Sequence, residues 1–338
     1  MALAFLGVMA MIWALGRRLR WPKAMVWGLI VLVYGVALGF QFIADGGNPA
    51  PWAIFGGIVA LVGAYAFGLS RLKSHARLEP ETKSQGTFRE AELERYARHI
   101  VLRELGGPGQ KKLKNAKVLV IGAGGLGSPV LMYLAAAGVG TIGVIDDDMV
   151  DHSNLQRQVI HRDEAIGTSK VHSAAEAMRA LNPYIEVRPY QRRLTVELAE
   201  ALFAEYDVIL DGTDNFTTRY LSNATAVALG KPLVSGALAQ WEGQLSVFDP
   251  VRGGPCYQCI FPEAPADGLA PSCAEAGVVA PLPGVIGTMM ALEAVKLITG
   301  AGHILRAEML IYDGLYGESR KIKLAARKDC PICHGEMA

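Results

Sequence analysis

The sequence predicts an α/β protein with a mostly parallel sheet, helices on both faces of that sheet, and transmembrane helices at the N-terminus. From Lys117 onward, short apolar runs alternate with segments of helical periodicity, which is typical of a parallel sheet. Beyond Gly236 the pattern changes to short strands, which predicts an additional antiparallel C-terminal part. The chain is 51% hydrophobic and only 19% charged, and the apolar excess lies in its first seventy residues.

The N-terminal apolar residues form three stretches, Ala2–Gly16, Ala24–Ala44 and Trp52–Ser70. A transmembrane helix takes about 20 apolar residues, so we expect two to three such helices within residues 1–70. Basic residues follow the first and third stretches and do not precede the first one, which argues against a cleaved signal peptide. Because Lys and Arg stay on the cytoplasmic side, we expect a multi-pass anchor in the inner membrane. The remaining chain then faces the cytoplasm. A buried helical hairpin is the alternative.

The elements after the membrane segment follow from apolar periodicity. Residues 71–87 are polar and charged, which predicts a linker to one domain over residues 88–338. Apolar residues at helical spacing predict a first helix over Phe88–Leu105. We predict strands at Val118–Ile121, Ile142–Ile145, Val208–Asp211, Pro232–Val234, Gly243–Phe248 and Met309–Tyr312. Further helices are predicted at Pro129–Ala137, Lys170–Leu181, Thr217–Leu229 and Gly284–Leu297.

A glycine-rich turn, GAGGLG over residues 122–127, directly follows the first predicted strand. This arrangement is typical of a Rossmann-like nucleotide site. Gly122, Gly124 and Gly125 allow the backbone to approach a phosphate, and the amides of the following helix start receive its negative charge. Asp146 lies at the end of the second strand and is expected to accept hydrogen bonds from ribose hydroxyls. Such a loop serves ATP as well as NAD.

Charged residues beyond Asp146 favour ATP. Asn154, Arg157 and Lys170 follow soon after it, and a departing pyrophosphate needs cationic side chains, whereas NAD is held mainly by backbone amides. Asp214 and Asn215 follow a predicted strand, where a carboxylate is placed to hold magnesium on the phosphates. The competing interpretation treats the two cations as solvated surface charges and Asp214 as a helix cap.

Five motifs stand in one order along the chain, namely RYARHI (95–100), GAGGLG (122–127), DHSNLQRQ (151–158), TDN (213–215) and CAEAGVVAPLPGVIG (273–287). Together they resemble the MoeB/ThiF/HesA family, bacterial relatives of ubiquitin-activating enzymes, and the MoeB type most of all. The resemblance covers about residues 90–337. It implies an ATP- and Mg-dependent adenylyltransferase. The implied substrate is the C-terminal glycine carboxylate of a small ubiquitin-like sulfur carrier, similar to MoaD or ThiS, that ends in Gly-Gly.

The resemblance also implies residue roles. Arg157 and Lys170 match the family's phosphate-binding pair, Asp214 its magnesium ligand and Asp146 its ribose contact. Ser153 and Asn154 fall in its nucleotide-contacting stretch. Arg98 matches an arginine that reaches the γ-phosphate in the partner subunit, which implies a homodimer; an ordinary surface arginine is the alternative. Cys273 matches the family's conjugating cysteine, and a buried structural thiol is the competing interpretation.

Two further cysteine pairs, Cys256/Cys259 and Cys330/Cys333, have the spacing of a zinc knuckle. Two such pairs predict a closed four-thiolate zinc site with a structural role, and a cytoplasmic domain is expected to lack disulfides. A redox-active pair is the weaker alternative, as is substitution of one ligand by His334. MoeB-like enzymes carry this cysteine arrangement.

The remaining expectations concern partners and pathway. A net charge of +1 gives no electrostatic basis for nucleic-acid binding. No sulfur-donating module follows Cys333, so a separate sulfur donor is expected. The sequence leaves open whether the carrier serves molybdopterin or thiamin synthesis. Two other functions remain as alternatives: an NAD-dependent oxidoreductase that uses the glycine-rich loop, and a non-catalytic membrane scaffold for ubiquitin-like carriers.

Overall fold

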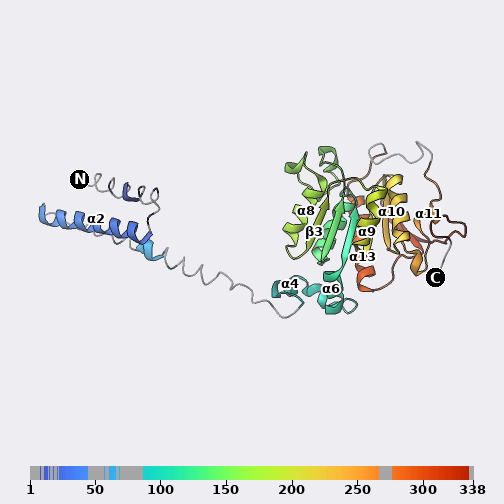
Figure 1. Cartoon of the computed structure of the whole chain (residues 1–338), viewed down its shortest axis with the longest axis horizontal. Coiled ribbons are helices and arrows are strands. Elements are labelled where there is room, and N and C mark those ends of the chain that lie inside the picture. Colours follow the sequence, from blue (N-terminus) through green and yellow to red (C-terminus); the bar gives the residue numbers. More distant parts are fainter. Residues whose placement is uncertain are drawn as a thin grey trace. The chain divides into compact units, whose positions relative to one another are not determined.

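The computed structural model describes residues 87–265 and 276–334 without a gap, helix α2 over Lys23–Ala44, and scattered positions between residues 8 and 68. The chain divides into two compact units, Met1–Lys83 and Ser84–Ala338 (Figure 1). This division lies close to the predicted boundary at residue 88. The predicted linker at 71–87 lies outside the described residues except for residue 87.

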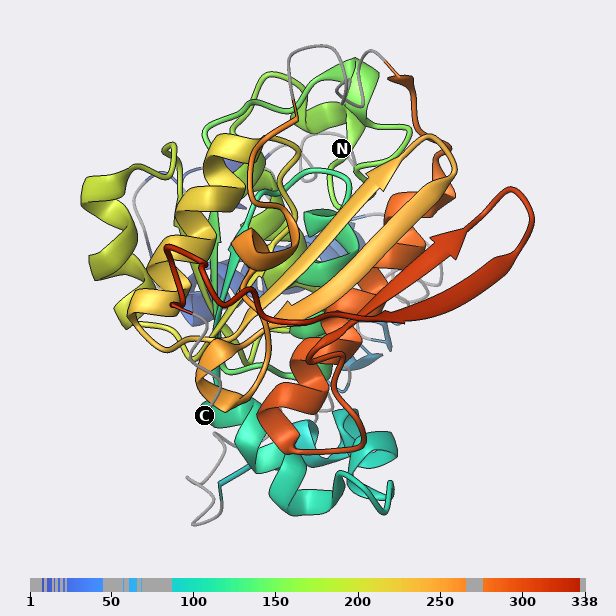
Figure 2. The ribbon, with the colours of Figure 1, turned by 90° about the vertical axis from the view of Figure 1, so that its right-hand side faces the viewer.

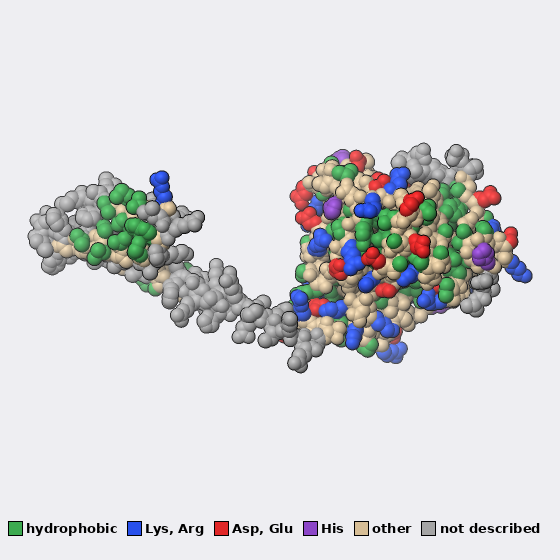
Figure 3. Space-filling model, in the orientation of Figure 1, with side chains coloured by type: hydrophobic (Ala, Val, Ile, Leu, Met, Phe, Trp, Pro, Cys, Tyr) green, Lys and Arg blue, Asp and Glu red, His purple; other side chains and the backbone are tan. Residues whose placement is uncertain are grey.

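The first unit contains α2, a 22-residue helix that coincides with the apolar stretch predicted at Ala24–Ala44. Its described side chains are mainly hydrophobic (Figure 3), and Leu32 and Val36 are 63% and 61% exposed. Among the described residues, the helix found long and apolar enough to span a membrane is α13 (Pro281–Thr299). Half of its apolar window is buried inside the second unit, so α13 is a core helix. The predicted N-terminal anchor therefore stays a prediction.

The second unit is built on an eight-stranded sheet of order β3-β2-β1-β4-β5-β6-β7-β8. Strands β1 to β5 are parallel, and β6, β7 and β8 continue the sheet in antiparallel fashion, as predicted for the C-terminal part. The β7–β8 hairpin extends beyond the rest of the sheet (Figure 2). The strands are β1 (Lys117–Ile121), β2 (Thr141–Ile145), β3 (Glu186–Tyr190), β4 (Val208–Asp211), β5 (Leu233–Ala239), β6 (Glu242–Phe248), β7 (Glu308–Asp313) and β8 (Glu318–Lys323).

Helices cover both faces of this sheet, which confirms the predicted three-layer arrangement. The other helices of the unit are α4 (Glu90–Arg95), α5 (Ala97–Ile100), α6 (Gly106–Asn115), α7 (Gly127–Ala137), α8 (Lys170–Leu181), α9 (Val196–Ala204), α10 (Phe216–Ala228) and α11 (Tyr257–Ile260). Short 3₁₀ turns lie at His152–Asn154, Asp163–Ala165 and Pro250–Arg252. Helices α7, α8 and α13 pack on one face of the sheet, and α9 and α10 pack on the other.

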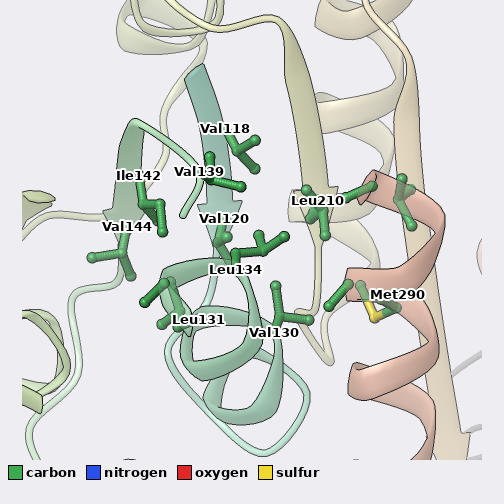
Figure 4. Packing of buried hydrophobic residues seen from close by; sticks show 14 of the residues in the cluster. Val118, Val120, Val130, Leu131, Leu134, Val139, Ile142, Val144, Leu210 and Met290 are labelled. Carbon is green, nitrogen blue, oxygen red and sulfur yellow. The ribbon is translucent and has the colours of Figure 1, made fainter. Parts of the chain in front are cut away.

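The core follows from the alternation of side chains along each strand. In β1, Val118 and Val120 face α7 and belong to one buried cluster with Leu134 of α7 and Met290 of α13, which lies farther along the sheet (Figure 4). Leu119 and Ile121 point to the opposite cluster, which contains Phe203 of α9. Every one of these residues is at most 2% exposed. Because both faces of β1 are buried after Lys117, its sequence is continuously apolar from Val118 to Ile121.

One predicted helix is wrong in its extent. Residues Phe88–Leu105 form the two short helices α4 and α5, separated at Tyr96, whose φ of -95° and ψ of 10° leave the helical region. The Tyr96 ring lies against Gly138, where an added Cβ would approach it to 2.4 Å, and its hydroxyl accepts a hydrogen bond from Asn182 at 2.8 Å. Tertiary contacts therefore fix Tyr96 and interrupt the helix.

Candidate active site

A cavity of about 1200 Å³ opens at the carboxyl ends of β1, β2 and β4 and continues beside β5 and β6. The strand order reverses between β1 and β4, and ligands of open parallel sheets bind at this point. The cavity brings together eight of the predicted residues: Gly122, Gly124, Gly125, Asp146, Arg157, Lys170, Asp214 and Asn215. Ser153 and Asn154 do not line it.

The glycine-rich loop turns sharply between β1 and α7. Gly122 has a φ of 93°, which favours glycine, and its N–H donates to the carbonyl of Ile145 at 2.9 Å. A Cβ on Gly127 would lie 2.0 Å from the carbonyl oxygen of Gly122, so this position excludes any side chain. The loop therefore needs glycine at both ends to bring its backbone against the cavity.

Asp146 directly follows β2, and both of its carboxylate oxygens accept hydrogen bonds from backbone N–H groups. Oδ2 accepts the N–H of Ala123 at 2.7 Å, and Oδ1 accepts the N–H of Asp148 at 2.8 Å. These bonds fix the carboxylate at the cavity wall and leave lone pairs on each oxygen for a ligand hydroxyl. The arrangement suits the ribose contact predicted for Asp146.

Lys170 begins α8, and its side chain is only 5% exposed. Its Nζ lies 2.7 Å from Oδ2 of Asp148, whose own side chain is 65% exposed. The backbone of the same two residues is joined by a 3.0 Å hydrogen bond from the Lys170 N–H to the Asp148 carbonyl. A buried ammonium is thus held at the cavity by one solvated carboxylate.

Arg157 reaches the cavity from the segment that follows the 3₁₀ turn at His152–Asn154. One guanidinium nitrogen donates to Oδ1 of Asn154 at 2.8 Å, and another donates to the Ser153 carbonyl at 3.3 Å. The turn is capped by Asp151, whose pKa is lowered by the Ser153 hydroxyl and N–H. Ser153 and Asn154 therefore orient Arg157 rather than line the cavity themselves.

Asp214 and Asn215 have different local roles. Asn215 is the N-cap of α10, since its Oδ1 accepts the N–H of Thr218 at 2.9 Å. The competing interpretation of Asp214 as a helix cap is therefore wrong, because its neighbour Asn215 caps the helix. Asp214 is exposed in the lining of the cavity, which leaves its carboxylate accessible to a magnesium ion.

Arg219 was not predicted, although it lines the cavity from α10 and is only 6% exposed. Its guanidinium donates to Oγ of Ser235 at 3.1 Å, to the Gly236 carbonyl at 2.8 Å and to the Thr213 carbonyl. It therefore ties the loop that carries Asp214 to β5. The signal available in the sequence was an arginine one turn after the Asn215 cap, on a helix with no other charged residue.

The four paired cysteines form one buried cluster. Sγ of Cys256 lies 3.8 Å from Cys259 and 3.5 Å from Cys330, and Sγ of Cys259 lies 3.4 Å from Cys333. A tetrahedral zinc with Zn–S bonds of about 2.3 Å requires sulfur separations of about 3.8 Å, so this donor set fits the metal. The contacts are too long for disulfides, and all four are free thiols.

Burial and backbone contacts act on these thiols in opposite directions. Burial raises the pKa of Cys256 and Cys259. It acts on Cys330 in the same direction, but hydrogen bonds from the backbone N–H groups of Cys333 and Ile332 outweigh it and hold the pKa of Cys330 at about 7. Backbone N–H groups that donate hydrogen bonds to a sulfur atom stabilise its thiolate form.

The last two predicted catalytic residues are Cys273 and Arg98. Cys273 lies outside the described residues. Arg98 is exposed on α5, between α4 and α6, which pack near the amino end of β2 through the contacts of Tyr96 and Gln110 with residues 137 and 138. In Figures 1 and 2, α4 and α6 lie at one end of the unit and the 3₁₀ turns of residues 152–165 at the other. Arg98 therefore does not line the cavity.

Known proteins resemble this chain over the second unit. Residues 96–332 match the ThiF family. The sulfur carrier protein adenylyltransferase of Thermus thermophilus is 49% identical over 249 residues, which cover 72% of this chain and 92% of that protein. The SAMP-activating enzyme E1 of Haloferax volcanii is 46% identical over 242 residues, which cover 72% of this chain and 89% of that protein. The probable adenylyltransferase/sulfurtransferase MoeZ of Mycobacterium tuberculosis is 51% identical over 255 residues, covering 75% of this chain but only 64% of that longer protein.

Solved structures show the same fold at lower identity. Escherichia coli MccB superposes with a TM-score of 0.63 at 22% identity, over 72% of this chain and 73% of that one. PaaA superposes with a TM-score of 0.61 at 23% identity, over 84% and 88%. The relatives named here do not favour the oxidoreductase or the scaffold alternative.

Proposed function

The chain belongs to the ThiF family, as its motifs indicated, and from this premise we propose that it adenylates the C-terminal glycine carboxylate of a small ubiquitin-like sulfur carrier. ATP is the nucleotide, and pyrophosphate leaves. The observation that carries the proposal is the meeting of Lys170, Arg157 and Asp214 with the glycine-rich loop around one cavity. Its volume of about 1200 Å³ exceeds that of an ordinary ligand pocket, which leaves room for the carrier's tail beside the nucleotide.

The reaction needs charge and position rather than a base. The carrier's carboxylate is ionised at neutral pH and attacks the α-phosphorus of ATP, while the bond from that phosphorus to the bridging oxygen of pyrophosphate breaks. Two anions must therefore be brought together, and charge must be stabilised on the leaving group. We assign these tasks to the ammonium of Lys170, the guanidinium of Arg157 and the amides of the glycine-rich loop.

Magnesium and ribose are assigned to carboxylates. Asp214 would hold magnesium, which when bound neutralises phosphate charge. Asp146 would receive the ribose hydroxyls, since both of its oxygens are fixed by backbone N–H groups. Arg219 touches carbonyls and a serine rather than an anion, so its task is to hold the Asp214 loop against β5.

We assign zinc to the four-cysteine cluster, with a structural role. Cys256 and Cys259 follow β6, and Cys330 and Cys333 lie in the C-terminal segment after β8. A metal held by all four would tie this segment to the body of the domain. Buried thiolates on all sides leave no open coordination position, which suits structure rather than catalysis.

We further propose a homodimer in which Arg98 of one subunit serves the cavity of its partner. The support is its exposure at the amino end of the sheet, where it does not line its own cavity. Cys273 and a separate sulfur donor are assigned to later steps of sulfur transfer in molybdopterin or thiamin synthesis, because adenylation itself needs no thiol. Residues 1–70 are proposed as the anchor that holds the domain at the cytoplasmic face of the inner membrane, and its support is the apolar helix α2.

The product of the reaction provides the test. Purified full-length protein is incubated with magnesium, ATP and a carrier that ends in Gly-Gly, and the carrier is then weighed by mass spectrometry. We expect an AMP adduct that forms with ATP and is absent when the carrier's last glycine is removed. A carrier that stays unmodified while NAD binds the cavity would refute the proposal. Cell fractionation tests the anchor. The protein should sediment with the membranes and should be released only by detergent.

A further inference from the structure

The imidazole of His161 joins the glycine-rich loop to helix α8. Its Nε2 lies 2.9 Å from the carbonyl oxygen of Ala123, and its Nδ1 lies 3.0 Å from Oγ of Ser173. A carbonyl only accepts hydrogen bonds, so Nε2 carries the proton. Nδ1 is then the acceptor for the Ser173 hydroxyl. With 7% exposure, the ring sits behind the cavity rather than in its lining.

Peptide geometry gives the first contact a consequence inside the cavity. In a trans peptide, the carbonyl of Ala123 and the N–H of Gly124 belong to one plane and point in opposite directions. His161 holds the carbonyl on the buried side, so the N–H of Gly124 is directed the other way, and Gly124 lines the cavity. The hydrogen bonds of the described residues include none from this N–H to a protein acceptor. It is therefore available to an anion.

The second contact fixes the phosphate-binding lysine relative to this amide. Ser173 lies one turn after Lys170 in α8, and its N–H donates to the Ser169 carbonyl at 3.0 Å, within the first turn of the helix. One ring thus sets the separation between the Gly124 N–H and the helix turn that carries the Lys170 ammonium. Burial lowers the pKa of His161, and the charge of Lys170 lowers it further, so the ring is neutral at pH 7.

We propose that His161 is a positioning residue for the nucleotide's phosphates, acting by its Nε2–H bond to Ala123. The inference rests on the proposed function, because it takes ATP as the ligand of the cavity. A ring that only supported the fold would affect all ligands and the stability alike. A ring that aims one loop amide affects ATP and spares adenosine, which has no phosphate.

Two substitutions of similar size separate these roles. The amide nitrogen of glutamine reaches the place of Nε2, whereas that of asparagine reaches only the place of Nδ1. His161→Asn should raise the Kd for MgATP about tenfold, the size of one net hydrogen bond, by isothermal titration. His161→Gln should stay within about threefold of the wild type. Both variants should bind adenosine as the wild type does. If the Asn variant is unfolded by circular dichroism, Ser173→Ala takes its place and should raise the Kd for MgATP about threefold.

The outcomes are distinct. Equal MgATP affinities in the Asn and Gln variants, an unchanged affinity in Ser173→Ala, or a parallel loss for ATP and adenosine would overturn the role of His161 and leave the proposed function standing. Wild-type protein that binds MgATP but never modifies a carrier would refute the proposed function, while the contrast between Asn and Gln still decides the inference. Wild-type protein that binds no MgATP refutes both.

Discussion

The Nζ of Lys170 lies 2.7 Å from Oδ2 of Asp148, and the two side chains differ sharply in exposure, at 5% and 65%. The ammonium has been removed from water and depends on this partner, whereas the carboxylate remains solvated. Removal of Lys170 should therefore mainly reduce catalysis, whereas removal of Asp148 should mainly reduce stability.

Lys170→Met should abolish most of the catalysis and leave the fold intact. Methionine keeps the buried stem, and Asp148 is solvated without its partner, so the free energy of unfolding should change by less than about 1 kcal/mol. Carrier-dependent ATP–pyrophosphate exchange should fall at least about 100-fold, because a cation on the leaving group is lost. Lys111→Met, an exposed change on α6, is the control. Exchange equal in the two variants would contradict the role of Lys170.

Asp148→Asn should lower the free energy of unfolding by about 1–3 kcal/mol, because the buried ammonium of Lys170 loses its charged partner. The matched control is the neighbouring substitution Asp147→Asn. Asp147 pairs at 3.2 Å with Arg193, whose side chain is 78% exposed, so this change should cost less than about 1 kcal/mol. Urea unfolding at pH 7 measures both. Equal losses would show that Lys170 does not depend on Asp148.

His161 should make stability depend on pH in a defined window. Its pKa is lowered in the folded protein by burial first and then by Lys170, while the Ala123 carbonyl and Asp146 act in the opposite direction. Below about pH 6.5 the unfolded chain binds a proton that the folded one excludes, so stability falls as pH falls. The slope should approach about 1.4 kcal/mol per pH unit at most. In His161→Gln this contribution to the pH dependence should vanish when the free energy of unfolding is measured between pH 7 and pH 5. Identical slopes in the variant and the wild type would contradict the prediction.

Metal analysis should find about one zinc per chain in the purified protein. Cys330→Ser should lose that zinc to a chelator under conditions in which the wild type retains it, and the unfolding temperature should drop by several degrees with it. Cys273→Ser is the control, since Cys273 belongs to neither pair, and its zinc content should equal that of the wild type. Retention of zinc in Cys330→Ser after chelation would remove Cys330 from the site.

Mixed dimers test the assignment of Arg98. Arg98→Ala and Asp214→Ala should each be inactive in exchange. If Arg98 acts on the partner's cavity, unfolding and refolding the two together should restore about a quarter of the wild-type activity, since half of the dimers are mixed and each has one intact site. Mixing after separate folding is the control. Continued inactivity of the refolded mixture would contradict the assignment of Arg98 to the partner's cavity.

The parallel sheet was predictable because its central strands are buried on both faces and read as apolar runs. Strands β3 and β8 and helix α6 were not predicted, and they lack that signal. Strand β3 is an edge strand with Pro189 and two charges, and β8 is exposed along its whole length. Helix α6 begins GGPG, a poor helical sequence that is held by contacts such as that of Gln110 with Ala137. The secondary structure of these segments is determined by tertiary packing rather than by the local sequence.

The parts of the site that could be predicted are those in which a structural requirement produces a recognisable sequence motif. The glycine-rich loop, the cations after β2 and the cysteine pairs could be found by spacing. His161 and Arg219 could not, because they act through carbonyl groups of other elements, and a sequence does not show which carbonyl a side chain will meet. The Asn154 side chain accepts a hydrogen bond from Arg157, and its predicted contact with the nucleotide stays a prediction.

The central claim is that these residues manage a departing pyrophosphate, and the exchange of labelled pyrophosphate into ATP tests it most directly. With magnesium and a carrier ending in Gly-Gly, we expect label in ATP that depends on the carrier and disappears in Lys170→Met. Label that never enters ATP with any such carrier, in protein that binds NAD and not ATP, would contradict the account.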